Sequence, residues 1–121
     1  MGGYLLVMTG GALGAGLRYG LGNLALRSWG PGFPWGTFAA HLIGGLAMGL
    51  LAGWLSARGG SDATRLFLGI GVLGGFTTFS AFSLETFHML SRGEPGAAIG
   101  YVAASVLGSA ALLWAGLAAA R

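Results

Sequence analysis

Hydroxyl-bearing and aromatic side chains crowd into one apolar part of the sequence. The stretch GGFTTFSAFSLET opens with the glycine pair Gly74–Gly75 and carries a single acid, Glu85, near its end. Its hydroxyl residues are Thr77, Thr78, Ser80, Ser83 and Thr86. Polar groups in a membrane segment are costly unless they pair with one another or line a cavity. The stretch therefore predicts a site for a small polar species.

Phe79 and Phe82 are three residues apart, so a helix presents both rings on one face. The edge of an aromatic ring carries the positive part of its quadrupole, so ring edges can contact an anion that a full positive charge would trap. Ordinary core packing is the alternative for this pair. A helix break at the glycine pair would free carbonyl groups, which is tolerated only where they are buried or line a cavity. Inward-pointing carbonyls can hold a small cation such as sodium.

Three other apolar segments also carry polar side chains. Arg18 lies in the first, while Thr37 and His41 are four residues apart on one face of the second. In the last segment a polar stripe with a spacing of four is formed by Tyr101, Ser105 and Ser109. Any single hydroxyl could instead bond its own i−4 carbonyl. The repetition of such stripes favours a shared polar route.

Composition identifies the segments that position these residues. The chain has 121 residues, of which 55% are hydrophobic and 7% charged, with a mean hydropathy of +0.77. A soluble domain has far more charge than this. The net charge of +3 forms no basic block, so no nucleic-acid partner is expected. Without cysteine, and with no nucleophile, base and orienting set, an enzyme is not expected either.

A membrane-spanning helix needs about 20 apolar residues, and the chain accommodates four such segments. We predict spans at Tyr4–Leu26, Trp35–Ala57, Thr64–Leu90 and Pro95–Ala118. The fold class is therefore an all-α membrane protein in the lipid bilayer, with residues 1–121 forming one four-helix domain. The third helix is expected to break at its glycine pair.

Small residues four apart let membrane helices approach closely. Candidate contact stripes in the first three spans are Gly10 and Gly14, Gly45, Gly49 and Gly53, and Gly71 and Gly75. The last span offers a corresponding stripe of Ala104, Gly108, Ala111 and Ala115.

Orientation in the membrane is not determined by charge. Four spans would put Arg58, Arg65 and Arg121 on one side, and Arg27 and Arg92 on the other. The positive-inside rule needs a bias, and this distribution has almost none. Insertion in both directions would permit an antiparallel homodimer, the intermolecular form of an inverted repeat. A single orientation remains equally open.

Three function classes are compatible with these residues. The first is a channel whose pathway the polar stripes line. The second is a small four-helix proton-coupled multidrug antiporter, although that family places its coupling carboxylate in the first span, where this chain has Arg18. The third is a structural or assembly subunit, which leaves the polar stripes and the broken helix without a purpose.

Three motifs resemble the Fluc (CrcB) fluoride channel family: GGALGAGLRYG, GTFAAHLIGGLAMG and GVLGGFTTFSAFSLET. The resemblance spans essentially the whole chain, and the third motif is highly specific. It implies an antiparallel dual-topology homodimer in the cell (plasma or inner) membrane. It also implies a fluoride-selective ion channel, through which cytoplasmic fluoride leaves passively and fluoride toxicity is reduced.

The resemblance also implies roles for individual residues. Phe79 and Phe82 correspond to the aromatic pair that lines the pore. Gly74 and Thr77 correspond to the backbone-carbonyl ligands of a structural sodium ion at the dimer centre. The remaining matches to the anion pathway are Arg18 at its wide end, Ser80 and Ser83 in the same motif, and Thr37, Glu85, Tyr101, Ser105 and Ser109 along a polar track.

Two positions depart from the family pattern. His41 stands where the family usually has Asn, and Ala81 where it usually has Thr. An imidazole can donate a hydrogen bond to an anion and can also take up a proton. We therefore expect His41 to replace the usual amide as a donor in the anion pathway.

Overall fold

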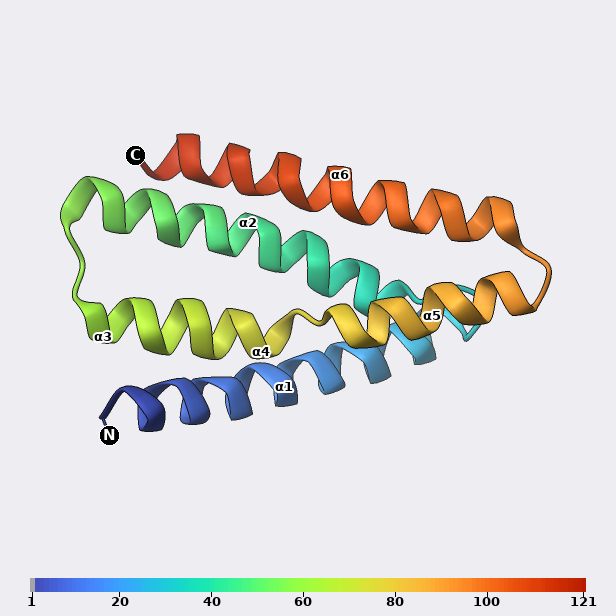
Figure 1. Cartoon of the computed structure of the whole chain (residues 1–121), viewed down its shortest axis with the longest axis horizontal. Coiled ribbons are helices and arrows are strands. Elements are labelled where there is room, and N and C mark those ends of the chain that lie inside the picture. Colours follow the sequence, from blue (N-terminus) through green and yellow to red (C-terminus); the bar gives the residue numbers. More distant parts are fainter. Residues whose placement is uncertain (1) are drawn as a thin grey trace.

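The structure is a computed structural model that describes residues 2–121, and within this range the secondary structure is helical without strands. Figure 1 shows the helices in order. They are α1 (Gly2–Trp29), α2 (Trp35–Arg58), α3 (Asp62–Thr64), the π-helix η1 (Arg65–Leu73), α4 (Gly74–Phe76), α5 (Phe79–Ser91) and α6 (Pro95–Ala120).

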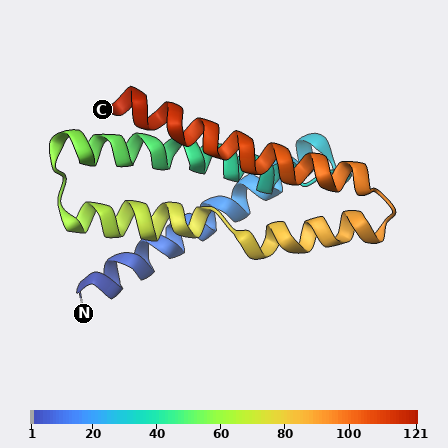
Figure 2. The same ribbon diagram turned by 45° about the horizontal axis from the view of Figure 1, so that its top comes forward.

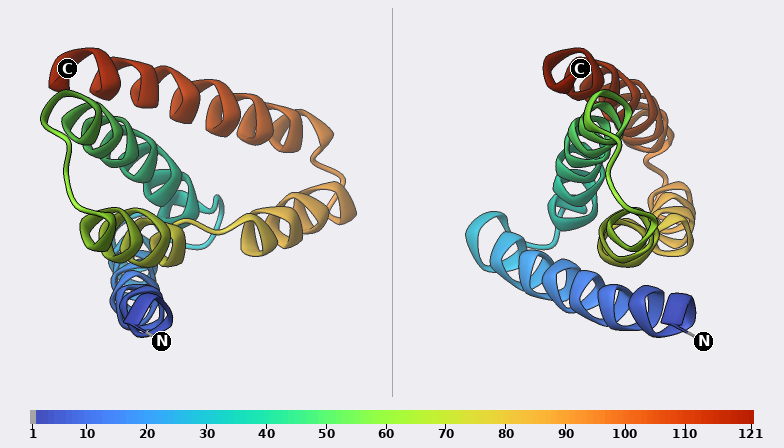
Figure 3. Two further views of the ribbon diagram at one scale, coloured as in Figure 1. Left: turned by 60° about the vertical axis from the view of Figure 1, so that its left-hand side comes forward. Right: turned by 90° about the vertical axis from the view of Figure 1, so that its left-hand side faces the viewer.

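The chain runs back and forth along one long axis, and both termini lie at the same end (Figure 1). Helices α2 and α6 lie side by side along their length (Figures 1 and 2). The segments α3, η1 and α4 continue one another, and α5 resumes after an extended step. Helix α1 crosses η1 and α4 on the side away from α6 (Figure 3).

Three helical segments are long and apolar enough to cross a membrane: Trp35–Arg58, Asp62–Ser91 and Pro95–Ala120. They contain the second, third and fourth predicted spans and define a multi-pass membrane protein. The first predicted span lies within α1, which is 28 residues long but does not reach the same apolarity. The polar side chains of Arg18 and Asn23 and the many glycines account for this difference.

The glycine stripes of the first three spans are contact surfaces, as predicted. A Cβ added at Gly49 would overlap the carbonyl oxygen of Leu113 on α6, and one at Gly45 would lie 2.6 Å from the Ser109 carbonyl oxygen. On α1, a Cβ at Gly10 would lie 2.5 Å from the Phe67 carbonyl oxygen of η1. Only glycine permits such close approach of two helix backbones.

The predicted small-residue stripe of α6 is wrong as an intrachain contact surface except at Gly108, where an added Cβ would lie 2.8 Å from the Leu42 side chain. Ala104, Ala111 and Ala115 are exposed in the chain, whereas Tyr101, Ser105 and Gly116 are buried. The helix is rotated so that its aromatic and hydroxyl stripe faces α2 and α5. Hydrogen bonding by Tyr101 and the close fit of Gly116 against Leu46 and Gly49 hold it in this rotation.

The break in the third span exists, but it lies after the glycine pair that predicted it. Gly74 keeps helical angles (φ −63°, ψ −39°), whereas Thr77 (φ −91°, ψ 155°) and Thr78 (φ −153°, ψ 127°) are extended. The Thr78 hydroxyl accepts a hydrogen bond of 3.3 Å from the Ala81 amide and so caps α5. Such side-chain caps favour a new helix start at threonine. The extended step is visible between α4 and α5 (Figure 3).

Candidate functional site

Two side chains from other helices bind backbone carbonyls at the break. The Arg18 Nε donates to the Gly75 carbonyl oxygen over 3.3 Å, and the His41 Nε2 lies 2.8 Å from the Thr78 carbonyl oxygen. Backbone groups released by a break must find partners at membrane depth. The break is therefore supported by α1 on one side and α2 on the other.

The predicted sodium ligands lie beside these supported carbonyls. Among the turn, cap and side-chain hydrogen bonds of residues 2–121, none goes to the carbonyl oxygen of Gly74 or Thr77. The Thr77 hydroxyl donates to the Leu73 carbonyl oxygen over 2.9 Å. Within the same residues no group of three or more His, Asp or Glu side chains could hold a metal. Backbone oxygens rather than side chains are therefore the candidate cation ligands at the break.

The two predicted pore phenylalanines are adjacent but differ in burial. Their ring centroids are 5.7 Å apart. Phe82 is 6% exposed within the chain, whereas Phe79 is 76% exposed. The Phe82 ring lies 5.3 Å from the His41 ring at 80°, an edge-on arrangement, and 5.0 Å from the Tyr101 ring. Phe82 is thus enclosed by polar rings, and Phe79 projects from the chain.

Glu85 joins three helices. The Thr37 hydroxyl of α2 donates to its Oε2 over 2.9 Å, and the Tyr101 hydroxyl of α6 donates to its Oε1 over 3.1 Å. Ser105, one turn beyond Tyr101, is buried, and its Oγ has no hydrogen-bond partner among the described residues. Thr37, Glu85 and Tyr101 of the predicted polar track therefore meet in space.

Two pockets of about 300 Å³ each are lined by different residues of the candidate site. One is lined by residues that include Thr37, Glu85, Phe33, His88, Met89 and Arg92. The other is lined by residues that include His41, Thr77, Thr78, Phe79 and Ser109. Phe82 packs against His41 of the second pocket and against Tyr101, whose hydroxyl donates to Glu85 of the first. A continuous line of polar and aromatic groups thus connects the two pockets.

Some predicted residues lie off this line. The Ser83 hydroxyl donates to the Phe79 carbonyl oxygen over 2.9 Å, the local bond that any helical serine can form. The Ser80 hydroxyl lies 3.2 Å from the Thr78 hydroxyl, and both serines are exposed in the chain. Arg18 reaches the break from α1 and lines neither pocket.

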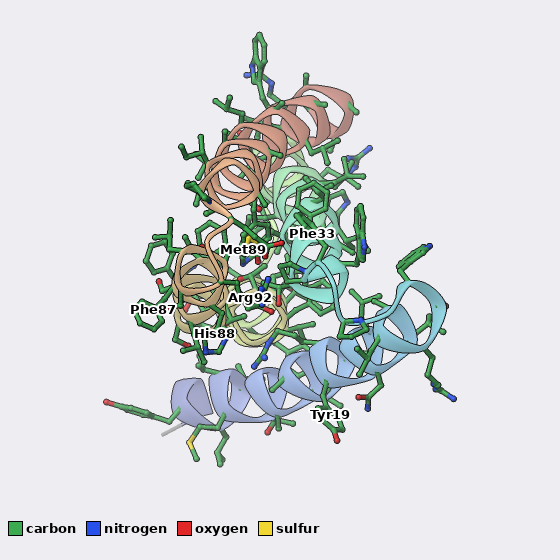
Figure 4. The ribbon with its side chains drawn as sticks, turned by 90° about the vertical axis from the view of Figure 1, so that its right-hand side faces the viewer. Tyr19, Phe33, Phe87, His88, Met89 and Arg92 are labelled. Atoms are coloured by element: carbon green, nitrogen blue, oxygen red, sulfur yellow. The ribbon has the colours of Figure 1, made fainter. Side chains whose placement is uncertain are left out.

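The sequence analysis missed Phe33, which lies in the turn before α2. Its ring packs edge-on against Tyr101, with centroids 5.3 Å apart at 84°. In Figure 4 Phe33 and Met89 meet between the helices, while Phe87 and Tyr19 point outward. Only the tertiary contact distinguishes Phe33 from the other aromatic residues near span ends.

These features define a class of protein: a multi-pass helical membrane protein with a broken helix, whose polar side chains connect two pockets within one bundle. The sequence matches the family described as CrcB-like protein, Camphor Resistance (CrcB), over residues 5–117. The chain belongs to this family.

Relatives in three bacteria are similar over nearly their whole length. The sequence is 53% identical to a protein of Novosphingobium aromaticivorans over 95% of this chain and 93% of the relative. The identity is 55% with one of Hyphomonas neptunium, covering 100% and 97%. It is 56% with one of Phenylobacterium zucineum, covering 97% and 94%. Each relative is named a fluoride-specific ion channel.

Proposed function

We propose that this protein is a fluoride-selective ion channel that lets cytoplasmic fluoride leave the cell passively and so reduces fluoride toxicity. The observation that carries the proposal is the line of hydroxyl groups and ring edges between the two pockets. The edge of an aromatic ring such as Phe82 can contact a small anion without the deep trap that a full positive charge would create, while Glu85 accepts the hydroxyl protons of Thr37 and Tyr101. The names and high identity of the relatives support it.

The antiporter alternative is not favoured. Proton coupling needs a titratable group in the pathway, and in that family this group is a carboxylate in the first span. Helix α1 has Arg18 at its middle and no acid between Gly2 and Trp29. None of the relatives described above is named a transporter of drugs.

Efflux from liposomes tests the function. Vesicles that contain the purified protein and are loaded with potassium fluoride should release fluoride when a potassium ionophore lets potassium leave with it, so that no membrane potential builds up. Chloride-loaded vesicles should release little. A discrimination of about 100-fold or more corresponds to a barrier difference of only about 2.7 kcal/mol. Equal release of both anions, or release that requires a proton gradient, would contradict the proposal.

We propose further that two copies assemble as an antiparallel dual-topology homodimer. The distribution of Arg58, Arg65 and Arg121 at one end, against Arg27 and Arg92 at the other, supports it. So does Phe79, a large ring of the candidate site that one chain leaves 76% exposed. The exposed ring would become a pathway residue if the second copy enclosed it.

Topology reporters check this assembly. A C-terminal tag should be detected on both sides of the membrane in comparable amounts. Adding three arginines after Arg121 should shift all copies to one orientation and lower the yield of dimer, because the positive-inside rule then has a bias to act on. A tag found on one side only in the unmodified protein would rule out dual topology.

We propose a structural sodium ion at the dimer centre, held by the carbonyl groups of Gly74 and Thr77. Its role would be to neutralise carbonyl dipoles that converge where the helix breaks. The detergent-solubilised dimer should unfold at a lower temperature when N-methylglucamine replaces sodium. Thr77→Val should keep this sodium dependence, since the backbone is unchanged, whereas Gly74→Val should abolish it. Equal melting temperatures in both salts would contradict the site.

A further inference from the structure

We infer that His41 is a positioning residue that fixes the helix break, and that its ring N–H is used on the Thr78 carbonyl instead of on the transported ion. The inference rests on the proposed channel function for its consequence, but its geometry stands on the chain alone. It differs from the expectation that imidazole replaces an amide as a donor to the anion.

The hydrogen bond determines which nitrogen carries the proton. A carbonyl oxygen can only accept, so the His41 Nε2, 2.8 Å from the Thr78 carbonyl oxygen, must donate. This distance is at the short end of the normal range for an N–H···O bond. In the neutral ring the other nitrogen, Nδ1, then carries a lone pair. A lone pair repels an anion, so neutral His41 has no second N–H to offer.

The bond acts at the residue where α5 begins. Thr78 is extended and is the N-cap of α5, and its hydroxyl accepts from the Ala81 amide. Its carbonyl receives the His41 N–H. The orientation of this one peptide therefore sets the first turn of the helix that carries Phe79 and Phe82.

One face of α2 follows the break and α5 over consecutive turns. Thr37 binds Glu85, and His41 binds Thr78 one turn later. At the next turn Gly44 is buried, and a Cβ there would overlap the Thr77 side chain. His41 is thus the middle member of a row of contacts that fixes α5 relative to α2.

The His41 ring also contacts Phe82 edge-on at 5.3 Å. The side chain thus combines two contacts, the packing of its ring and the hydrogen bond of its N–H, and two different substitutions are needed to separate them. His41→Phe preserves an aromatic ring of similar shape next to Phe82 and removes only the N–H donor. His41→Gln removes the ring and restores a side chain that can donate to a carbonyl.

Hydrogen exchange without fluoride tests the role directly. In fluoride-free nanodiscs, amides in the first turn of α5, Ala81 among them, should exchange at least about tenfold faster in His41→Phe than in the wild type, because the break is no longer held. His41→Gln should exchange close to the wild-type rate. Thr86→Val is a matched control, since its hydroxyl bonds only the Phe82 carbonyl oxygen within α5, and its first turn should be unaffected.

Nitrogen NMR of the unmodified protein keeps the test independent of folding of the variants. The His41 ring should carry its proton on Nε2 both with and without fluoride. A proton on Nδ1, or a tautomer change on adding fluoride, would overturn the inference.

Efflux completes the test. His41→Phe should slow fluoride efflux and His41→Gln should restore most of it. Slow efflux in His41→Phe with wild-type exchange would assign the ring N–H to direct ion contact and overturn the inference. If the wild type conducts no fluoride, but exchange is still faster in His41→Phe than in the wild type, the channel function is refuted and the role of His41 at the break holds.

Discussion

Replacing both Phe79 and Phe82 with isoleucine should slow fluoride efflux by about 100-fold or more and leave the dimer assembled. Isoleucine keeps an apolar side chain but has no ring edge, so the positive rim that can face an anion is lost. A loss of about 1.4 kcal/mol of barrier stabilisation per ring is a tenfold change in rate for each. Fluoride release from liposomes measures the effect, and size-exclusion chromatography verifies assembly.

The structure provides a control for this experiment on the same helix. Phe87 is 62% exposed, and its only aromatic neighbour among the described residues is His88. Phe87→Ile also replaces an aromatic ring with isoleucine, but away from the line between the pockets. Efflux should stay within about threefold of the wild type, which is a change in the barrier of roughly 0.7 kcal/mol. Unchanged efflux in the Phe79→Ile, Phe82→Ile protein would show that the two rings are packing elements only.

The second large effect is expected at a glycine that lies outside the proposed ion pathway. Gly49→Ala should destabilise the protein by about 3 kcal/mol or more and reduce the yield of folded dimer. The added methyl group would overlap the Leu113 carbonyl oxygen and lie 2.9 Å from the Leu113 Cα. Both atoms belong to the α6 backbone, so no rotamer change relieves the overlap, and α2 and α6 must separate.

Gly16→Ala is the matched comparison. It adds the same methyl group to a helix, but no heavy atom outside the local helix backbone lies within 4 Å of it. Since alanine favours a helix over glycine, the protein should be as stable as the wild type or slightly more so. Thermal unfolding in detergent compares the two variants. Equal melting temperatures would mean that the α2–α6 approach is looser than the structure has it.

Local features of this chain could be predicted from the sequence because they depend on neighbouring residues. Apolar length placed the second, third and fourth spans within a few residues of α2, of the segment Asp62–Ser91 and of α6. Periodicity identified Gly45, Gly49 and Gly53 as one contact face. The same reasoning placed the break at the glycine pair because glycine is flexible. The break lies after it, where Thr78 caps α5.

Only the tertiary structure decided which side chains meet. Glu85 lies 48 residues from Thr37, and His41 lies 37 residues from Thr78. Periodicity tells which residues share a helix face, but not which helix that face meets or how the partner is rotated. The glycine contacts between α2 and α6 set that rotation, so they turned the polar stripe of α6 inward and left Ala104, Ala111 and Ala115 outside. They also account for Tyr101 reaching Glu85, a partner that its own helix could not supply.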